Sequence, residues 1–245
     1  MENNMFKLYD IKPQKIFDFV KKRNDKYFEN PKLDILKDIL EDENKKSQYI
    51  NNDGYFSDDF YLKYEKEKVE DVLNGMYELF ECYVHAKFKE LITKDNNYKK
   101  IEIGDYVADK LNLGNNFGSG YRQVIRDESN SYLSGPVIPD IVLKYNDKYF
   151  IYDVKCKDSR GSGNSRGDRL QLLAYQVMYE AAEIGHIFPF RREDEISARK
   201  KDDIISKNAK VNLVSEKQVC YYQYDVNIEN IDRTIRDILD RLTSE

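Results

Sequence analysis

Apolar residues recur at intervals of three and four positions over much of the chain, which is the spacing of amphipathic helices. The clearest case covers residues 60–92, where Met76, Phe80 and Val84 fall on one side of a helix. We therefore expect one long helix across this stretch, with its apolar side facing a core.

Two shorter amphipathic patterns precede this helix, at residues 16–20 and 33–40. The second follows Asn30-Pro31, and proline at the first helical position is typical of a helix start. The sequence thus predicts a small N-terminal helical segment over residues 1–58, followed by a main domain over residues 59–245.

After residue 100 the pattern changes to short apolar and alternating runs, which are typical of β-strands. Two such runs, 138–144 and 149–156, flank Asn146-Asp147, and this arrangement predicts a β-hairpin. The other expected elements are a strand near 101–103, a helix near 107–111, strands at 121–126, 187–190, 211–214 and 218–224, helices at 168–183 and 228–242, and a charged loop or solvated helix at 191–210. This order predicts an α/β fold in which helices flank a mixed β-sheet.

Composition excludes several classes of protein. The chain has 245 residues and a formal net charge of −5, which argues against coating nucleic acid by bulk charge, although a local basic rim remains compatible with it. Cys82, Cys156 and Cys220 are far apart and form no metal-binding motif, so we expect reduced thiols. No apolar run is long enough for a membrane span or a signal peptide, and we expect a cytoplasmic protein with no membrane partner.

The candidate chemistry lies on the predicted hairpin. Side chains alternate between faces along a strand, so Asp153, Lys155 and Lys157 share one face of the second arm. Asp140 stands at the start of the first arm and can lie beside Asp153. Two adjacent carboxylates repel each other, and a hard divalent cation such as Mg²⁺, or Mn²⁺ in its place, removes that penalty. Lys155 can orient a water molecule or neutralise charge that develops on a phosphate.

The helix expected at 168–183 also points toward this site. Gln171 and Tyr175 are four residues apart and share one helix face, and Asp168 lies near the same side. A catalytic role for Asp168 and a simple N-cap role are equally open. The apolar residues that we expect to face inward on this helix are Leu170, Leu173, Ala174, Val177 and Ala181.

Further candidates surround the site. Glu81 borders the buried stripe of the long helix and can complete a metal shell, with Glu78 as the competing candidate. Arg160, Arg166 and Arg169 flank a Gly/Ser-rich loop at 158–167, where they can contact DNA phosphates. His85 is interpreted as a partly buried helix residue.

Taken together, these motifs resemble those of the PD-(D/E)xK nuclease superfamily, and in particular the nuclease subunit of McrBC- and LlaJI-type restriction systems. The resemblance covers about residues 60–245 and rests on Leu79-Phe80-Glu81, Ile138–Leu143, Asp153–Lys157, Asp168–Tyr175 and Gly185–Pro189. It implies a restriction-endonuclease-like fold and Mg²⁺-dependent cleavage of double-stranded DNA. It also implies metal binding by Glu81, Asp140 and Asp153, catalysis by Lys155, and support or DNA contacts from Lys157, Gln171 and Tyr175.

The family also suggests partners. Its nuclease subunit uses a larger N-terminal region to engage a GTP-hydrolysing motor, whereas about 58 residues precede the nuclease core here, which argues against dependence on such a motor. The chain has no nucleotide-binding G-x-x-x-x-G-K-[ST] loop of its own. A homodimer would supply two active sites for a double-strand cut.

Three functions therefore follow from the sequence. The leading hypothesis is a restriction or antiviral-defence endonuclease acting on DNA. A repair or recombination exonuclease of the same fold is the second, because Gln171 and Tyr175 also resemble that group. The third is a nucleic-acid-binding module without catalytic activity.

Overall fold

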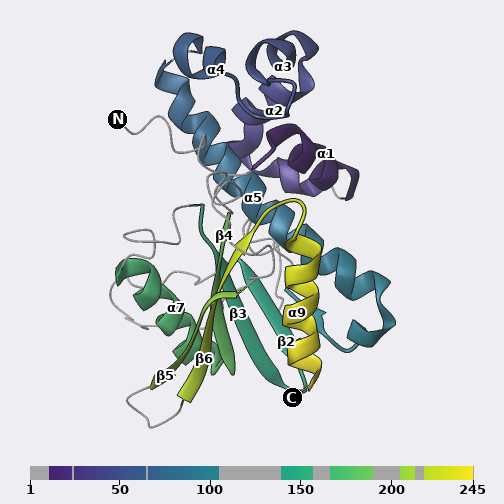
Figure 1. The fold of residues 1–245 in the computed structure, drawn as a ribbon, viewed down its shortest axis with the longest axis vertical. Coiled ribbons are helices and arrows are strands. Elements are labelled where there is room, and N and C mark those ends of the chain that lie inside the picture. Colours follow the sequence, from purple (N-terminus) through teal and green to yellow (C-terminus); the bar gives the residue numbers. More distant parts are fainter. Residues whose placement is uncertain are drawn as a thin grey trace, which may run out of the picture.

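The fold places a group of short helices above a β-sheet that carries helices on both faces (Figure 1). This computed structural model describes residues 11–23, 25–64, 66–104, 139–156, 166–189, 205–212 and 218–244. The helix expected near 107–111 and the strand expected at 121–126 lie outside the described residues.

The helical character predicted for the N-terminal part is confirmed over its described residues, which form several short elements. They are α1 (Pro13–Arg23), α2 (Asp34–Glu41), α3 (Glu43–Tyr49) and α4 (Asp58–Lys63), with 3-10 turns η2 (Asp25–Glu29) and η3 (Pro31–Leu33) between α1 and α2. Side chains start three of these elements: Asn30 accepts a hydrogen bond from the Lys32 amide, Asp42 from the Asn44 and Lys45 amides, and Ser57 from the Phe60 amide. Such N-caps satisfy amides that the helix itself leaves without a partner.

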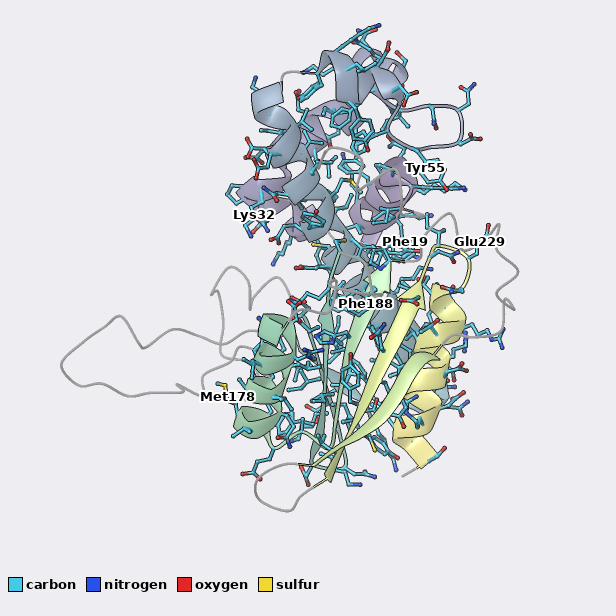
Figure 2. The ribbon with its side chains drawn as sticks, turned by 60° about the vertical axis from the view of Figure 1, so that its left-hand side comes forward. Phe19, Lys32, Tyr55, Met178, Phe188 and Glu229 are labelled. Carbon is cyan, nitrogen blue, oxygen red and sulfur yellow. The ribbon has the colours of Figure 1, made fainter. Side chains whose placement is uncertain are left out.

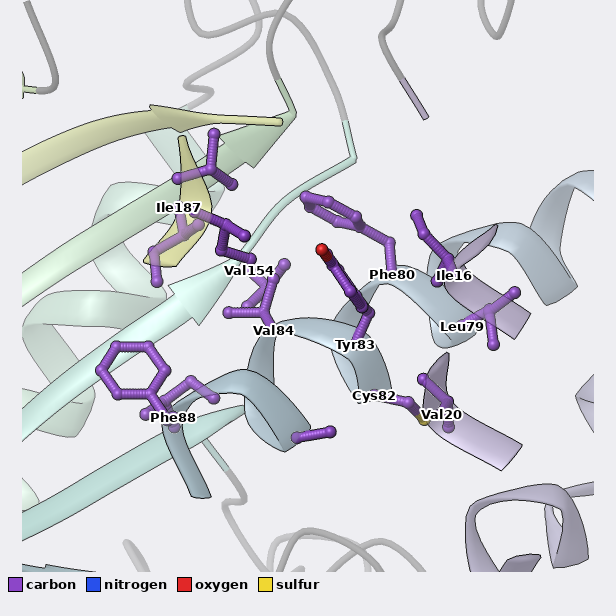
Figure 3. Close-up of a cluster of buried hydrophobic side chains, with 14 of the residues drawn as sticks. Ile16, Val20, Leu79, Phe80, Cys82, Tyr83, Val84, Phe88, Val154 and Ile187 are labelled. Atoms are coloured by element: carbon purple, nitrogen blue, oxygen red, sulfur yellow. The ribbon is translucent and has the colours of Figure 1, made fainter. Parts of the chain in front are cut away.

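The prediction of one helix over 60–92 was wrong in its first turns. The structure has α4 and then a separate helix, α5 (Lys66–Lys94), followed by the 3-10 turn η4 (Asn96–Tyr98). The break falls at Tyr64, whose backbone is extended (φ −66°, ψ 147°) and ends α4. The N-terminal helices pack directly on α5, where Ile16 and Val20 of α1 lie against Leu79 and Cys82 (Figure 3).

Six strands of the described chain form one mixed sheet in the order β1-β2-β3-β4-β6-β5. Their bounds are β1 Glu102–Ile103, β2 Ile141–Tyr145, β3 Lys148–Val154, β4 Glu183–Pro189, β5 Ile205–Asn212 and β6 Gln218–Val226. Strands β1, β2 and β3 pair antiparallel, β3, β4 and β6 pair parallel, and β5 pairs antiparallel with β6. The predicted mixed sheet flanked by helices is therefore confirmed.

The predicted hairpin is β2–β3. Its turn residues, Asn146 and Asp147, both have positive φ angles, 48° and 60°. Such angles match the twist of the flanking strands in a two-residue turn, and Asn and Asp tolerate them better than most residues. The local turn signal was thus sufficient to locate the hairpin.

Strand β5 corrects the prediction for residues 191–210. The last part of that stretch, from Ile205, is strand rather than charged loop or solvated helix. Among the described strands β5 pairs with β6 alone and lies at the edge of the sheet, and edge strands commonly carry charged side chains such as lysines. Smaller corrections concern β4, which begins at Glu183, and the closing helix α9, which spans Ile231–Ser244.

The two faces of the sheet are covered by different helices. Phe150, Tyr152 and Val154 of β3 point to the face that α5 and α9 cover, whereas Ile151 points to the face that helix α7 (Arg166–Tyr179) covers. Figure 2 shows α7 on one side of the sheet and α9 on the other. The carboxyl ends of β3 and β4 point toward the N-terminal helices, and the candidate site lies there (Figure 1).

The predicted inward face of α7 was wrong for most of its residues. Leu170 and Val177 are 54% and 67% exposed, and Ala174 is exposed as well. The buried apolar residues are instead Leu172, Tyr175, Met178 and Tyr179. Both stripes are apolar, but the stripe with two tyrosines and a methionine removes more apolar surface from water, so it faces the sheet.

This orientation of α7 predicts a contrast between two substitutions. Leu172→Ala is expected to lower the free energy of unfolding by about 2–5 kcal/mol, because it leaves a cavity against the sheet. Val177→Lys is expected to change it by less than ~0.5 kcal/mol, because that side chain faces solvent. Urea denaturation measures both, and a larger loss for Val177→Lys would contradict this orientation.

Candidate active site

Asp140 is fixed to the end of β3 by a hydrogen bond. Its Oδ2 atom accepts from the Val154 amide at 2.8 Å, across the open end of the hairpin. Asp140 and Asp153 are 6% and 1% exposed, so both carboxyl groups are almost fully removed from water. The hairpin therefore brings together the two acids that the sequence proposed as partners.

Lys155 completes the group. Its Nζ atom lies 2.6 Å from Asp153 Oδ2, although strand β3 ends one residue earlier, at Val154. The Lys155 amide still donates to the Ile187 carbonyl at 2.9 Å. The strand pairing with β4 thus continues to Lys155, and the side-chain alternation continues with it. This explains why the amine lies on the same face as Asp153, as predicted.

The charges in this group influence one another strongly. Burial raises the pKa of Asp153 well above its usual value, and the neighbouring Asp140 carboxyl raises it further. Burial lowers the pKa of Lys155, but the carboxylates of Asp153, Asp140 and Glu81 outweigh it, so the pKa of Lys155 is raised overall. The raised pKa of Lys155 favours its ammonium form, while the two acids are held together at an electrostatic cost.

Helix α7 contributes the polar side that we predicted. Lys155 Nζ donates to Gln171 Oε1 at 3.3 Å, and Gln171 Nε2 donates to Tyr175 Oη at 2.7 Å. Gln171 thus contacts the ammonium group directly, and Tyr175 holds the Gln171 side chain in place. Asp168 is buried in the first turn of α7, two residues after the helix begins, so the N-cap interpretation of Asp168 was wrong.

Glu81 of α5 is near the site, whereas Glu78 is engaged elsewhere. Glu81 raises the pKa of Lys155, and it also raises the pKa of the Cys156 thiol, after the larger effect of burial. Glu78 instead forms an ion pair with Lys32 and accepts a hydrogen bond from Asn30 at 3.1 Å. Within the described residues, no group of three or more acids, histidines or cysteines is gathered closely enough to hold a metal ion. The role of Glu81 as a metal ligand stays a prediction.

The predicted DNA-contacting residues are only partly described. Lys157 and Arg160 lie outside the described residues, as does the side chain of Arg166. Arg169 is exposed on the first turns of α7. His85, as expected, is a buried helix residue, with hydrogen bonds to Tyr27 Oη and to the Gly104 carbonyl, each 2.8 Å.

Sequence reasoning missed His186. Parallel pairing puts it directly beside Asp153, with Nε2 at 3.9 Å from Asp153 Oδ2. His186 is fully buried, and its Nδ1 atom lies 3.1 Å from Tyr221 Oη. Gln223 follows in the same register, so a buried polar row runs across the sheet from Asp153. The histidine itself was visible in the sequence, but its neighbour depends on the β3–β4 register, which has no local signal.

Comparisons with known proteins assign this chain to no family. No protein-family model matches the chain, and it shows no significant similarity to a curated protein. Within the described part of the chain, no helix is both long and apolar enough to cross a bilayer. What is established is therefore a mixed α/β protein with a buried carboxylate pair and an adjacent lysine at the end of its central strands.

Proposed function

We propose that this protein is a divalent-metal-dependent endonuclease that hydrolyses DNA phosphodiester bonds in restriction or phage defence, on a restriction-endonuclease-like fold. The observation that carries the proposal is the convergence of the Asp140 and Asp153 carboxyl groups with the Lys155 ammonium group at the end of β3. A hairpin followed by a helix and a parallel strand provides the frame for these groups.

The residues present suit a hard cation such as Mg²⁺, for which Mn²⁺ can substitute. Mg²⁺ is commonly held by one or two carboxylates, with waters and substrate phosphates as its other ligands. Asp140 and Asp153 would provide the two carboxylates, and the positive charge of a bound cation would offset the repulsion and burial that raise the pKa of Asp153. When bound, the metal supplies an activated water and polarises the phosphodiester.

The protein's own residues orient the reaction. The raised pKa of Lys155 favours its ammonium form, which can stabilise the negative charge that develops on the phosphate in the transition state. Gln171 and Tyr175 limit the positions that this ammonium group can adopt. Glu81 adds negative charge beside Lys155 and remains the candidate for a third metal ligand.

Cleavage of supercoiled plasmid DNA tests the proposal. We expect nicked and linear products in Mg²⁺ or Mn²⁺ and none in EDTA. Lys155→Ala is expected to slow cleavage by about 10²–10³-fold, because a charge-stabilising group is lost. Lys144→Ala removes the lysine of another ion pair on the same hairpin, with Asp147, and is the matched control that keeps the wild-type rate.

Two results would end this proposal: cleavage that persists in EDTA, or full activity of Lys155→Ala with an unchanged circular dichroism spectrum. The hydrogen-bonded pair of Gln171 and Tyr175 also fits the second hypothesis, an exonuclease. Degradation of linear duplexes together with inert circular DNA would favour that activity. Absence of Mg²⁺ and Mn²⁺ binding by calorimetry would favour the non-catalytic module.

A further inference from the structure

A cleft of about 520 Å³ lies away from the candidate active site, between the end of α1, η2 and the second half of α5. Its volume is within the range of small-molecule binding sites. The polar and aromatic side chains that matter for its chemistry are Lys22, Arg23, Tyr27, Lys89, Glu90 and Lys94. Four of these six are cationic and one is acidic, although the whole chain has a formal net charge of −5.

The single carboxylate of the cleft is already engaged. Glu90 accepts a hydrogen bond from Arg23 Nη2 at 2.6 Å and forms an ion pair with Lys94. Burial favours the neutral acid, but these two cations outweigh it, and the pKa of Glu90 is lowered. The Arg23 guanidinium also stacks on Phe19, 3.2 Å from the ring centroid, so its position is held from two sides.

Lys22 and Lys89 have no such partner. Among the residues that the structure describes, neither forms an ion pair, and both are exposed at the cleft. Lys22, Arg23 and Lys94 lie in the last turns of their helices, where cations are favoured by the helix dipole. Lys89 lies more than one turn before the end of α5, so the dipole does not account for it.

We propose that this cleft binds phosphate groups. Exposed lysines supply the charge, and the fixed Arg23 provides a planar donor on the wall. The phosphodiester backbone of DNA is one source of such groups, and this assignment rests on the proposed nuclease function. Glu81 and Lys89 are eight residues apart on α5, about 12 Å along its axis, and the DNA source requires a duplex that reaches both the site and the cleft. A free phosphorylated compound is the other source.

Binding without cleavage tests the DNA source. Fluorescence anisotropy with a 20-bp duplex in Ca²⁺ compares the full-length wild type with Lys22→Ala/Lys89→Ala across a range of salt concentrations. We expect the double variant to bind roughly ten- to a hundredfold more weakly near 0.1 M salt, with a shallower salt dependence, since each lost phosphate contact lowers the slope by about one. Lys37→Ala/Lys148→Ala removes the same charge elsewhere and is the matched control, with expected affinity close to wild type.

Tripolyphosphate tests the other source and is independent of nuclease activity. Calorimetry measures its binding to the wild type and to both double variants. Loss of tripolyphosphate binding in Lys22→Ala/Lys89→Ala, with unchanged DNA affinity, supports a phosphate site for a free compound. If the wild type never cleaves DNA but the Lys22→Ala/Lys89→Ala variant still loses tripolyphosphate binding, the phosphate-binding cleft is supported and the proposed nuclease function is rejected. The proposal is overturned if the Lys22→Ala/Lys89→Ala variant binds DNA and tripolyphosphate with the same affinities as the Lys37→Ala/Lys148→Ala control.

Discussion

Asp153→Asn is expected to reduce DNA cleavage by about 10³-fold or more while raising the melting temperature of the metal-free protein. The activity falls because one of the two carboxylates of the pair is lost. Metal assistance lowers the activation barrier by several kcal/mol, and a 10³-fold loss of rate corresponds to ~4 kcal/mol. The stability rises because burial and Asp140 disfavour the Asp153 carboxylate, as its raised pKa indicates, and the amide carries no charge.

Plasmid cleavage and differential scanning calorimetry measure the two effects at pH 7. Asp147→Asn changes an exposed aspartate on the same hairpin and should leave both unchanged, since its side chain is 95% exposed.

The sign of the stability effect also predicts a pH dependence. A raised Asp pKa contributes stability that is present at low pH and lost as the pH rises through the folded pKa, so the advantage of the variant should shrink on acidification. A destabilised but active variant would contradict both parts.

Arg241→Ala is expected to lower the free energy of unfolding by about 3–5 kcal/mol, which corresponds to roughly 10 °C in melting temperature for a chain of this size. Arg241 of α9 donates to both carboxylate oxygens of Glu183, at 2.6 and 3.1 Å, and to Tyr224 Oη at 2.5 Å. Tyr152 donates to the same carboxylate. Because Glu183 is only 2% exposed, loss of the guanidinium leaves a buried charge without its counterion.

The control for this prediction is on the same helix. Arg236 pairs with Asp95 at 3.1 Å, but its side chain is 48% exposed, so Arg236→Ala should cost less than ~1 kcal/mol. Thermal unfolding of the two variants is sufficient to compare them. If Glu183→Gln/Arg241→Met recovers most of the stability, the loss arises from the unpaired charge rather than from packing of α9. Equal small losses for Arg241→Ala and Arg236→Ala would contradict the role of the buried pair.

The features predicted correctly from the sequence depend on local signals. Asn146 and Asp147 specify a turn by their own backbone preferences, and alternation along β3 then orients Asp153 and Lys155. The four-residue spacing of Gln171 and Tyr175 correctly predicted a shared helix edge. Each of these inferences needed only residues that are close in sequence.

The wrong predictions concern features that depend on contacts between residues far apart in the sequence. Two apolar stripes compete on α7, and only the sheet beneath it selects the stripe with Tyr175. The polar composition of β5 concealed a strand that pairing with β6 stabilises. The break between α4 and α5 falls at Tyr64, where the sequence has no glycine or proline to signal the end of a helix. His186 reaches Asp153 through a register between strands that α7 separates in sequence.

The hairpin that joins β2 and β3 makes assembly of the acidic pair a short-range event. Asp140 and Val154 are only 14 positions apart, so closing this loop costs little chain entropy compared with contacts between distant segments. The short connection also makes the position of Asp153 sensitive to the length of the turn. Inserting a single residue at Asn146-Asp147 would shift the pairing by one position and turn Asp153 toward the opposite layer, where the aromatic rings of β3 now lie.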